Sequence, residues 1–189
     1  MKTRLKRLEK YIPKYCYQTI FDIPYIKLYE SGKRVILIDI DNTMISYDLV
    51  YPTDEVIKLI DEVKKIGFKV IIVSNNSKIR VAKVASRLDV GFAYRAMKPF
   101  LKGFRKAYKL VSNKKEEVIS VGDQLMTDVK GSNRFGVDAI LVHCIKRASE
   151  KWYTKLNRKR ENNILKMIKD NYPLEFEKII KVRGLENEN

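Results

Sequence analysis

Two acidic side chains follow the most apolar segment of the chain. Asp39 and Asp41 stand one residue apart at the end of the run 35–40, and Asn42 and Thr43 come next. A carboxylate held in such a place can attack phosphorus, and a second one can exchange a proton with the leaving oxygen. Taken alone, the stretch D-I-D-N-T is equally well an Asx turn that ends a strand.

Each later strand of the predicted sheet is also followed by polar side chains. They are Ser74 and Asn75 after 70–73, Lys98 after 92–94, and Asp123 with Asp128 after 118–121. Ligands of an open parallel sheet bind beyond the carboxyl ends of its strands, so these groups are expected at one edge. Each has a simpler reading on its own: a turn serine, a surface lysine, or a helix N-cap. The ordered set is much harder to obtain by chance.

Strands and helices alternate between residues 35 and 142. The predicted strands are 35–40, 70–73, 92–94, 118–121 and 139–142, and the predicted helices are 54–66, 77–88, 99–111 and 128–135. This alternation predicts right-handed βαβ units and a parallel sheet covered by helices on both faces. A further basic helical stretch is predicted at 150–170.

The charge of the chain is unusual. Its 189 residues carry 39 Lys and Arg against 23 Asp and Glu, a formal net charge of +16. Residues 1–34 hold nine basic and three acidic side chains, and residues 144–189 hold twelve and seven. This balance favours an anionic partner such as nucleic acid, an anionic membrane surface or a phosphorylated substrate. The alternative is a solvated, lysine-rich surface.

The length predicts a single domain, residues 1–189, with a core at about 34–145. The basic extensions 1–33 and 146–189 are expected to pack on that core. Cys16 and Cys144 are too few for a disulfide framework or a metal cluster, so both are expected to be reduced. No apolar run resembles a signal peptide or a membrane span. The expected location is cytoplasmic, either soluble or peripheral on the inner face of the membrane.

The ordered polar set resembles the four motifs of the haloacid dehalogenase (HAD) superfamily of phosphohydrolases. Asp39, Asp41 and Thr43 fit the first motif, Ser74 the second, Lys98 the third, and Asp123 with Asp128 the fourth. The resemblance implies a Rossmann-like, three-layer α/β/α fold with a mostly parallel central sheet. It also implies a phosphoaspartyl mechanism.

Within this resemblance, Asp39 is the expected nucleophile and Asp41 the expected general acid and base. The Ser74 hydroxyl is expected to donate to a phosphoryl oxygen, and Lys98 to neutralise charge that develops there. Arg134 is a candidate for binding a second phosphate of the substrate, or else a helix C-terminal cation that faces the dipole. Asn75 is a further substrate-binding candidate.

Repulsion between the two carboxylates and a phosphate calls for a cation, and Mg²⁺ prefers oxygen ligands of this kind. The expected ligands are the side chains of Asp39 and Asp123 and, by resemblance, the backbone carbonyl of Asp41. Thr43 is expected to support the loop, and Asp128 to orient Lys98 or a metal-bound water.

The spacing leaves no room for an inserted cap domain. Thr43 and Ser74 are separated by 30 residues, and Ser74 and Lys98 by 23, which the core elements use fully. An uncapped site favours a large or surface-held substrate. The runs 73–77, 96–99 and 122–129 and the basic tail 154–161 are similar to the YqeG family, a capless branch of subfamily IIIA.

Members of the YqeG family and their organellar relatives are associated with dephosphorylation of phosphatidylglycerophosphate to phosphatidylglycerol. The resemblance therefore implies an anionic phospholipid substrate, with peripheral contact to an anionic membrane. One alternative is a HAD phosphatase of nucleotides, nucleic-acid ends or phosphoproteins. Another is a non-catalytic RNA- or ribosome-binding protein, although the chain shows no recognisable RNA-binding module.

Overall fold

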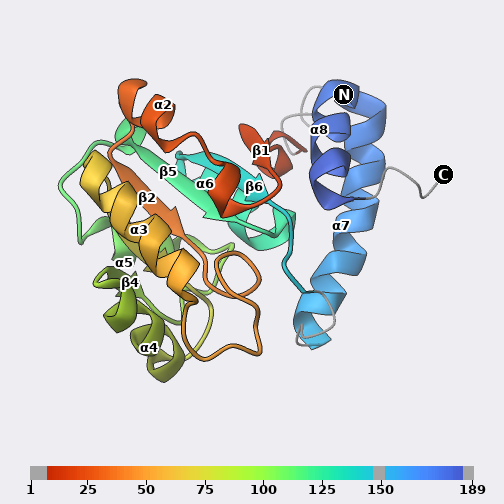
Figure 1. Ribbon diagram of the computed structural model, residues 1–189. Coiled ribbons are helices and arrows are strands. Elements are labelled where there is room, and N and C mark those ends of the chain that lie inside the picture. The colour runs from red at the N-terminus through yellow and green to blue at the C-terminus, as the bar shows by residue number, and fades with distance from the viewer. Residues whose placement is uncertain (1–7, 147–151, 185–189) are drawn as a thin grey trace.

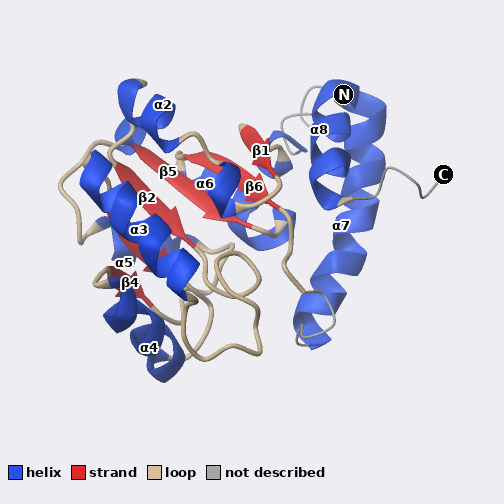
Figure 2. Ribbon diagram, in the orientation of Figure 1, coloured by secondary structure: helices blue, strands red, loops and turns tan. Residues whose placement is uncertain are grey.

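A six-stranded parallel sheet forms the centre of the protein in this computed structural model, which describes residues 8–146 and 152–184 (Figures 1 and 2). The strands are β1 (Tyr15–Tyr17), β2 (Val35–Ile38), β3 (Lys69–Val73), β4 (Gly91–Ala93), β5 (Val118–Gly122) and β6 (Asp138–Val142). They lie in the order β1-β6-β5-β2-β3-β4, and every neighbouring pair is parallel. The predicted α/β class is confirmed.

Helices cover both faces of the sheet, which gives three layers (Figure 2). One face carries α2 (Tyr25–Glu30), α3 (Asp54–Ile66) and α4 (Lys78–Leu88). The other carries α5 (Leu101–Tyr108), α6 (Lys130–Phe135), α7 (Trp152–Asn171) and α8 (Pro173–Arg183). Short helical turns are η1 (Glu9–Tyr11), η2 (Ile20–Asp22), η3 (Lys115–Glu117) and the π-helix η4 (Leu125–Val129).

The core explains why the central strands consist almost entirely of apolar residues. In β2, Ile36 and Ile38 face the layer of α3 and α4, whereas Val35 and Leu37 face α5 and α6. A strand buried on both faces needs apolar side chains at every position. The end of β2, which Asp39 follows directly, is therefore held rigidly.

The helix ends are set by local chemistry. The Thr53 hydroxyl accepts a hydrogen bond from the Val56 N–H at the start of α3, and Ser77 caps α4 through the Arg80 N–H. Helix α3 ends at Gly67, whose φ of +115° is a left-handed conformation that glycine adopts without strain. The cap at Ser77 stands where α4 begins, a few residues beyond the end of β3.

Four parts of the fold differ from the sequence expectation. Residues 15–17 were not predicted as a strand, yet β1 pairs with β6 at the edge of the sheet. The predicted helix 128–135 is divided between η4 and α6, and the predicted helix 99–111 is shorter. Helix α7 covers most of the predicted stretch 150–170, and α8 follows it as an antiparallel partner that had no prediction.

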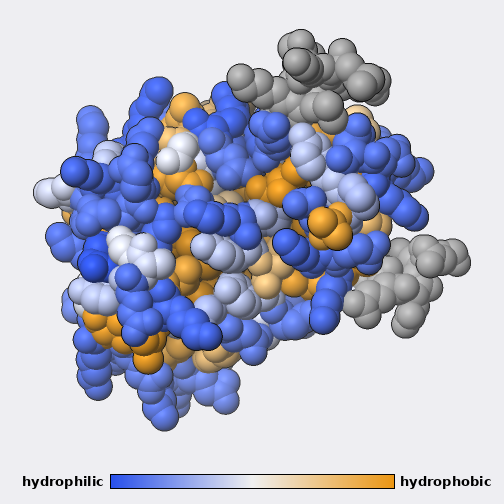
Figure 3. Space-filling model, turned by 90° about the horizontal axis from the view of Figure 1, so that it is seen from above, coloured by the Kyte–Doolittle hydropathy of each residue, from blue (hydrophilic) through white to orange (hydrophobic). Residues whose placement is uncertain are grey.

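No cap domain interrupts the core. All residues between Thr43 and Lys98 are described, and they hold only α3, β3, α4, β4 and the connecting loops. Among the described residues, no helix combines the length and the apolar character that a membrane crossing requires. The face seen from above is mainly hydrophilic, with smaller hydrophobic areas between the polar side chains (Figure 3).

Candidate active site

The polar groups predicted at one edge of the sheet do meet there. The Asp39 N–H donates to the Val121 carbonyl at 3.0 Å, which extends the pairing of β2 with β5 by one step. Asp123 follows β5, so the two carboxylates lie side by side at neighbouring strand ends. Asp128 reaches the same place from η4, and Lys98 from the loop after β4.

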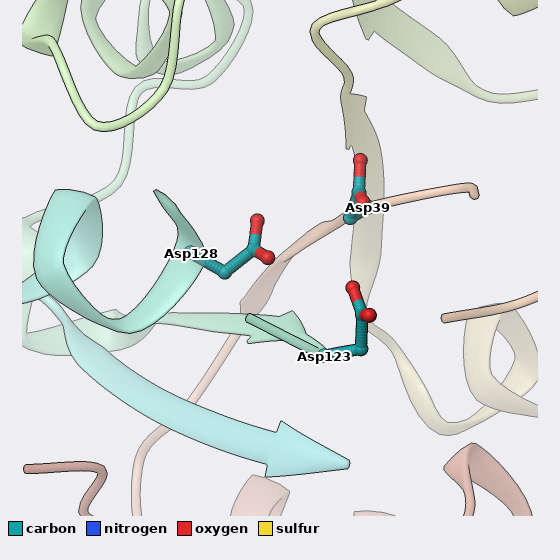
Figure 4. Close-up of side chains that lie close together, drawn as sticks. All are labelled: Asp39, Asp123 and Asp128. Atoms are coloured by element: carbon teal, nitrogen blue, oxygen red, sulfur yellow. The ribbon is translucent and has the colours of Figure 1, made fainter. Parts of the chain in front are cut away.

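Three buried carboxylates converge on one small space (Figure 4). Asp39, Asp123 and Asp128 each offer an oxygen atom, and these atoms all lie within 4.8 Å of one another. All three residues are buried. Such a set of oxygen donors fits a hard divalent cation such as Mg²⁺.

Lys98 is the cation of this cluster among the described side chains. Its Nζ lies 2.8 Å from Asp39 Oδ1 and 2.6 Å from Asp128 Oδ1. Burial raises the pKa of Asp39 well above its usual range; Lys98 opposes this, and the carboxylates of Asp128, Asp41 and Asp123 add to it. Burial disfavours the Lys98 ammonium, but the two carboxylates outweigh it and raise the lysine pKa. The raised pKa of Asp39 thus follows first from burial, and the raised pKa of Lys98 follows from its two carboxylate partners.

In the loop that carries Asp128, the Asp128 side chain packs directly against Gly122. A Cβ added to Gly122 would lie 2.3 Å from Asp128 Cγ, so only glycine leaves room for this carboxylate. Asp128 Oδ2 accepts hydrogen bonds from the Gln124 N–H and the Thr127 hydroxyl, both at 3.2 Å. The π-helical geometry of η4 is rare and is frequent at functional sites.

Asn75 holds the loop that carries Lys98. Its Oδ1 accepts from the Lys98 N–H at 2.6 Å, and its Nδ2 donates to the Lys98 carbonyl at 3.2 Å. Within that loop Arg95 and Met97 have φ values of +45° and +55°. Left-handed conformations cost a non-glycine residue about 1–2 kcal/mol, so the surrounding contacts must hold them.

Asp41 is held apart from the three converging carboxylates. Its Oδ1 lies 2.7 Å from the Arg80 guanidinium, and its Oδ2 accepts from Asn76 Nδ2 at 3.2 Å. Arg80 also donates to the Leu49 carbonyl at 2.8 Å. The side chain that would transfer protons is therefore anchored by the first turn of α4.

The comparison with known families decides the assignment. The description "haloacid dehalogenase-like hydrolase" matches residues 3–136. The chain belongs to this family. It is also 37% identical over 167 residues to "Probable phosphatase YqeG" of Bacillus subtilis (strain 168), covering 88% of this chain and 96% of that one. The predicted membership of the YqeG family and the predicted enzyme class, a HAD phosphatase, are confirmed.

Solved structures with a similar fold include other members of the superfamily. A HAD phosphatase from Thermococcus onnurineus is 18% identical, with a TM-score of 0.49, over 64% of this chain and 89% of that one. The putative HAD-hydrolase YfnB of Bacillus subtilis bound to magnesium is 14% identical, with a TM-score of 0.46, over 58% and 86%.

The remaining predicted residues of this HAD hydrolase lie around the cluster. Ser74 is fully buried, and its hydroxyl accepts from the Asn76 N–H at 3.1 Å. The Thr43 hydroxyl donates to Asp123 Oδ1 at 3.3 Å. Arg134 is exposed and donates to the Pro99 carbonyl at 3.3 Å, so its contact in this structure is with the loop after Lys98.

Sequence reasoning missed Arg80, Asn76 and Glu161. Arg80 and Asn76 stand close to Ser74 in the chain, and the Ser77 cap could have placed Arg80 within the first turn of α4. Glu161 lies on α7 and is fully buried; its Oε1 accepts from the Met126 N–H at 3.0 Å, and its Oε2 pairs with Arg183. The C-terminal helices thus hold the loop between Asp123 and Asp128.

Replacing Glu161 by Ala is expected to lower the free energy of unfolding by about 3 kcal/mol, because it removes the carboxylate from a buried ion pair. Urea unfolding at neutral pH measures this change. Glu161→Gln keeps an acceptor for the Met126 N–H and should lose less. Equal stability of Glu161→Ala and the unchanged protein would show that this pair does not anchor η4.

Proposed function

We propose that this HAD hydrolase is a Mg²⁺-dependent phosphomonoesterase that converts phosphatidylglycerophosphate to phosphatidylglycerol through an aspartyl-phosphate intermediate. The observation that carries the proposal is the buried cluster of Asp39, Asp123 and Asp128 beside Lys98. A carboxylate at a fixed strand end, next to a cation and further oxygen donors, is what phosphoryl transfer requires of a protein.

In the first step, an Asp39 oxygen attacks phosphorus and forms an acyl phosphate, while the bond between phosphorus and the ester oxygen breaks. Asp41 gives its proton to that oxygen, which leaves as an alcohol. For this transfer Asp41 must face the substrate, so its contacts with Arg80 and Asn76 serve as the resting position.

In the second step, a water attacks phosphorus of the acyl phosphate, and Asp41 accepts the proton of that water. The bond between phosphorus and Asp39 breaks, which releases inorganic phosphate and restores the carboxylate. Lys98 neutralises charge on the phosphoryl oxygens, and Ser74 donates its hydroxyl to one of them. Asp128 holds Lys98 in place.

Asp39, Asp123 and the backbone carbonyl of Asp41 would hold the Mg²⁺, which would neutralise the excess negative charge and polarise the phosphate. Thr43 supports Asp123 in this arrangement. Asp128 contributes the third oxygen donor of the cluster, beside Lys98.

The lipid substrate is supported by three features. The site lacks a cap, so a substrate held at a surface can reach it. The net charge of +16 favours an anionic surface, at about 1 kcal/mol for each well-placed Lys or Arg. The chain also belongs to the YqeG family, and the resemblance to that family implies a lipid substrate. The proposed location is the cytoplasmic face of a membrane.

The deciding experiment measures phosphate release from phosphatidylglycerophosphate in mixed micelles with Mg²⁺, alongside nucleotides, 5′-phosphorylated oligonucleotides and phosphopeptides. We expect turnover of the lipid to exceed that of every other compound. Inert lipid with turnover of another compound would keep the phosphatase and reject the lipid. No turnover of any compound, together with salt-sensitive RNA binding, would favour the non-catalytic alternative.

Mg²⁺ is expected to raise the thermal midpoint of unfolding, since a ligand that binds only the folded state stabilises it by about 1.4 kcal/mol at tenfold its dissociation constant. Asp123→Asn should lose most of this shift. Asp138→Asn is the matched control, because Asp138 binds Lys14 and Lys33 near the opposite ends of the strands. An unchanged shift in Asp123→Asn would contradict the assigned ligand.

A further inference from the structure

Exposed apolar side chains concentrate on the segments that follow the strands, at the same edge of the sheet as the buried carboxylates. Of the eleven large hydrophobic residues exposed in the described part of the chain, seven lie on segments that follow β2, β3, β4 and β6. These seven, here called the apolar rim, are Leu49, Val50, Tyr51, Ile79, Met97, Phe100 and Ile145. Single exposed hydrophobic residues are ordinary, but a group at one edge marks an interaction surface.

The apolar rim is connected to the residues of the site by short contacts. The Leu49 carbonyl accepts from Arg80, which also binds Asp41. The Ile145 N–H donates to the Asn42 carbonyl at 3.1 Å. Met97 directly precedes Lys98, and the Phe100 N–H donates to the Met97 carbonyl at 2.8 Å. The segments that carry Leu49, Met97 and Ile145 therefore adjoin the residues at the edge where Asp39 lies.

Backbone conformation supports an outward role for Met97. Its φ of +55° is strained for a residue with a side chain, and it stands beside the buried Lys98 while its own side chain is half exposed. Strain of this kind persists where surrounding structure imposes it and clusters at functional sites. In Figure 1 the orange loop between β2 and α3 projects from the sheet on the side of α4.

Exposed cations adjoin the rim. Lys78 precedes Ile79, Lys102 follows Phe100, and Lys146 follows Ile145; Arg95 stands two residues before Met97. Within the segments 46–51, 78–79, 95–102 and 145–146 the acidic residue is Asp48, which pairs with Lys146 at 2.8 Å. Apolar side chains flanked by cations are typical of surfaces that rest in the headgroup region of anionic membranes.

We propose that the apolar rim docks the protein on an anionic lipid bilayer, with its hydrophobic side chains at the acyl boundary and the neighbouring cations among the headgroups. This orientation turns the opening of the site toward the membrane surface, where a lipid phosphate is presented without extraction from the bilayer. The inference rests on the proposed lipid substrate, which it extends by naming the docking surface.

The test measures partitioning onto vesicles of phosphatidylcholine and phosphatidylserine in equal parts, with phosphatidylcholine vesicles as the neutral reference. Phosphatidylserine carries no phosphomonoester, so partitioning is independent of turnover. The rim variant is Ile79→Ser with Phe100→Ser, whose side chains are 73% and 61% exposed. The control is Leu174→Ser with Ile26→Ser, at 73% and 62% exposed and away from the rim.

We expect the unchanged protein and Asp39→Asn to bind the anionic vesicles equally, and the rim variant to bind about tenfold more weakly. The control should remain within about twofold of the unchanged protein. Equal binding of rim variant and control, or equal binding to neutral vesicles, would overturn the proposal. Loss of self-association in the rim variant, without any vesicle binding, would assign the rim to a second copy of the chain.

This test separates the two proposals. Hydrolysis of phosphatidylglycerophosphate in micelles by a protein that does not bind vesicles would reject the docking surface alone. Rim-dependent binding without lipid hydrolysis would support the docking surface and reject the substrate.

Discussion

Replacing Asp39 by Asn is expected to lower phosphate release by at least about 10⁴-fold, because the amide cannot form the acyl phosphate. The same change should leave the free energy of unfolding equal or higher. Asp39 lies in a buried cluster with excess negative charge, and burial and the neighbouring carboxylates raise its pKa. A neutral side chain removes that repulsion, while Lys98 keeps its contact with Asp128. Single-turnover phosphate release and urea unfolding measure the two effects.

Asp138→Asn is the matched control for this result. Asp138 binds Lys14 at 2.8 Å and Lys33 at 2.6 Å, and it begins β6 at the far end of the strands from the site. We expect this variant to lose about 1 kcal/mol of stability and to keep its turnover. If Asp39→Asn retained more than about one hundredth of the turnover, Asp39 would not be the nucleophile.

Replacing Lys98 by Met should destabilise the protein by about 3–5 kcal/mol at neutral pH, because the buried carboxylates of Asp39 and Asp128 lose their ammonium partner. The pKa of Asp39 in the folded state already exceeds that of the unfolded chain. The folded state therefore binds more protons above about pH 4, and the free energy of unfolding falls as pH rises toward the folded pKa. Without Lys98 this pKa is higher still, so the fall should continue to a higher pH and be larger in total. Urea unfolding at acidic and alkaline pH checks the slope.

Turnover of Lys98→Met should fall by about 10²–10³-fold, as when one electrostatic donor to a developing charge is removed. Lys33→Met provides the comparison, since Lys33 is equally buried but binds Asp138 and the Glu116 carbonyl. That variant should lose stability and keep turnover. If the loss of stability in Lys98→Met did not change with pH, the protonation of the carboxylates would not depend on this lysine.

Much of the sheet could be predicted because each central strand is a short, continuous apolar run. The strand β1 has no such pattern: it spans three residues, Tyr15, Cys16 and Tyr17, and its partner lies more than a hundred residues further along the chain. Nothing local distinguishes it from a loop. The π-helix η4 could not be predicted either, because the close packing of Asp128 against Gly122 is a tertiary contact.

The site residues at strand ends were predictable in type and edge, since parallel strands deliver their carboxyl ends to one place. Their partners were not. The sequence does not indicate that Arg80 donates a hydrogen bond to Asp41. It also does not indicate that Asn75 accepts one from the Lys98 N–H. Glu161 was beyond reach because its role depends on how α7 packs against η4. Contacts between distant segments are determined by tertiary packing.

The position of β1 constrains the order in which the sheet can fold during synthesis. The Lys14 N–H donates to the Ala139 carbonyl at 2.9 Å, so the first strand made must pair with the last one. A ribosome adds roughly 5–20 residues per second, so the aromatic N-terminal segment remains unpaired for several seconds while the rest of the sheet emerges. The edge of the sheet beside β6 is therefore completed only after β6 has left the ribosome, and the nascent chain should be most prone to aggregation and to chaperone capture until then.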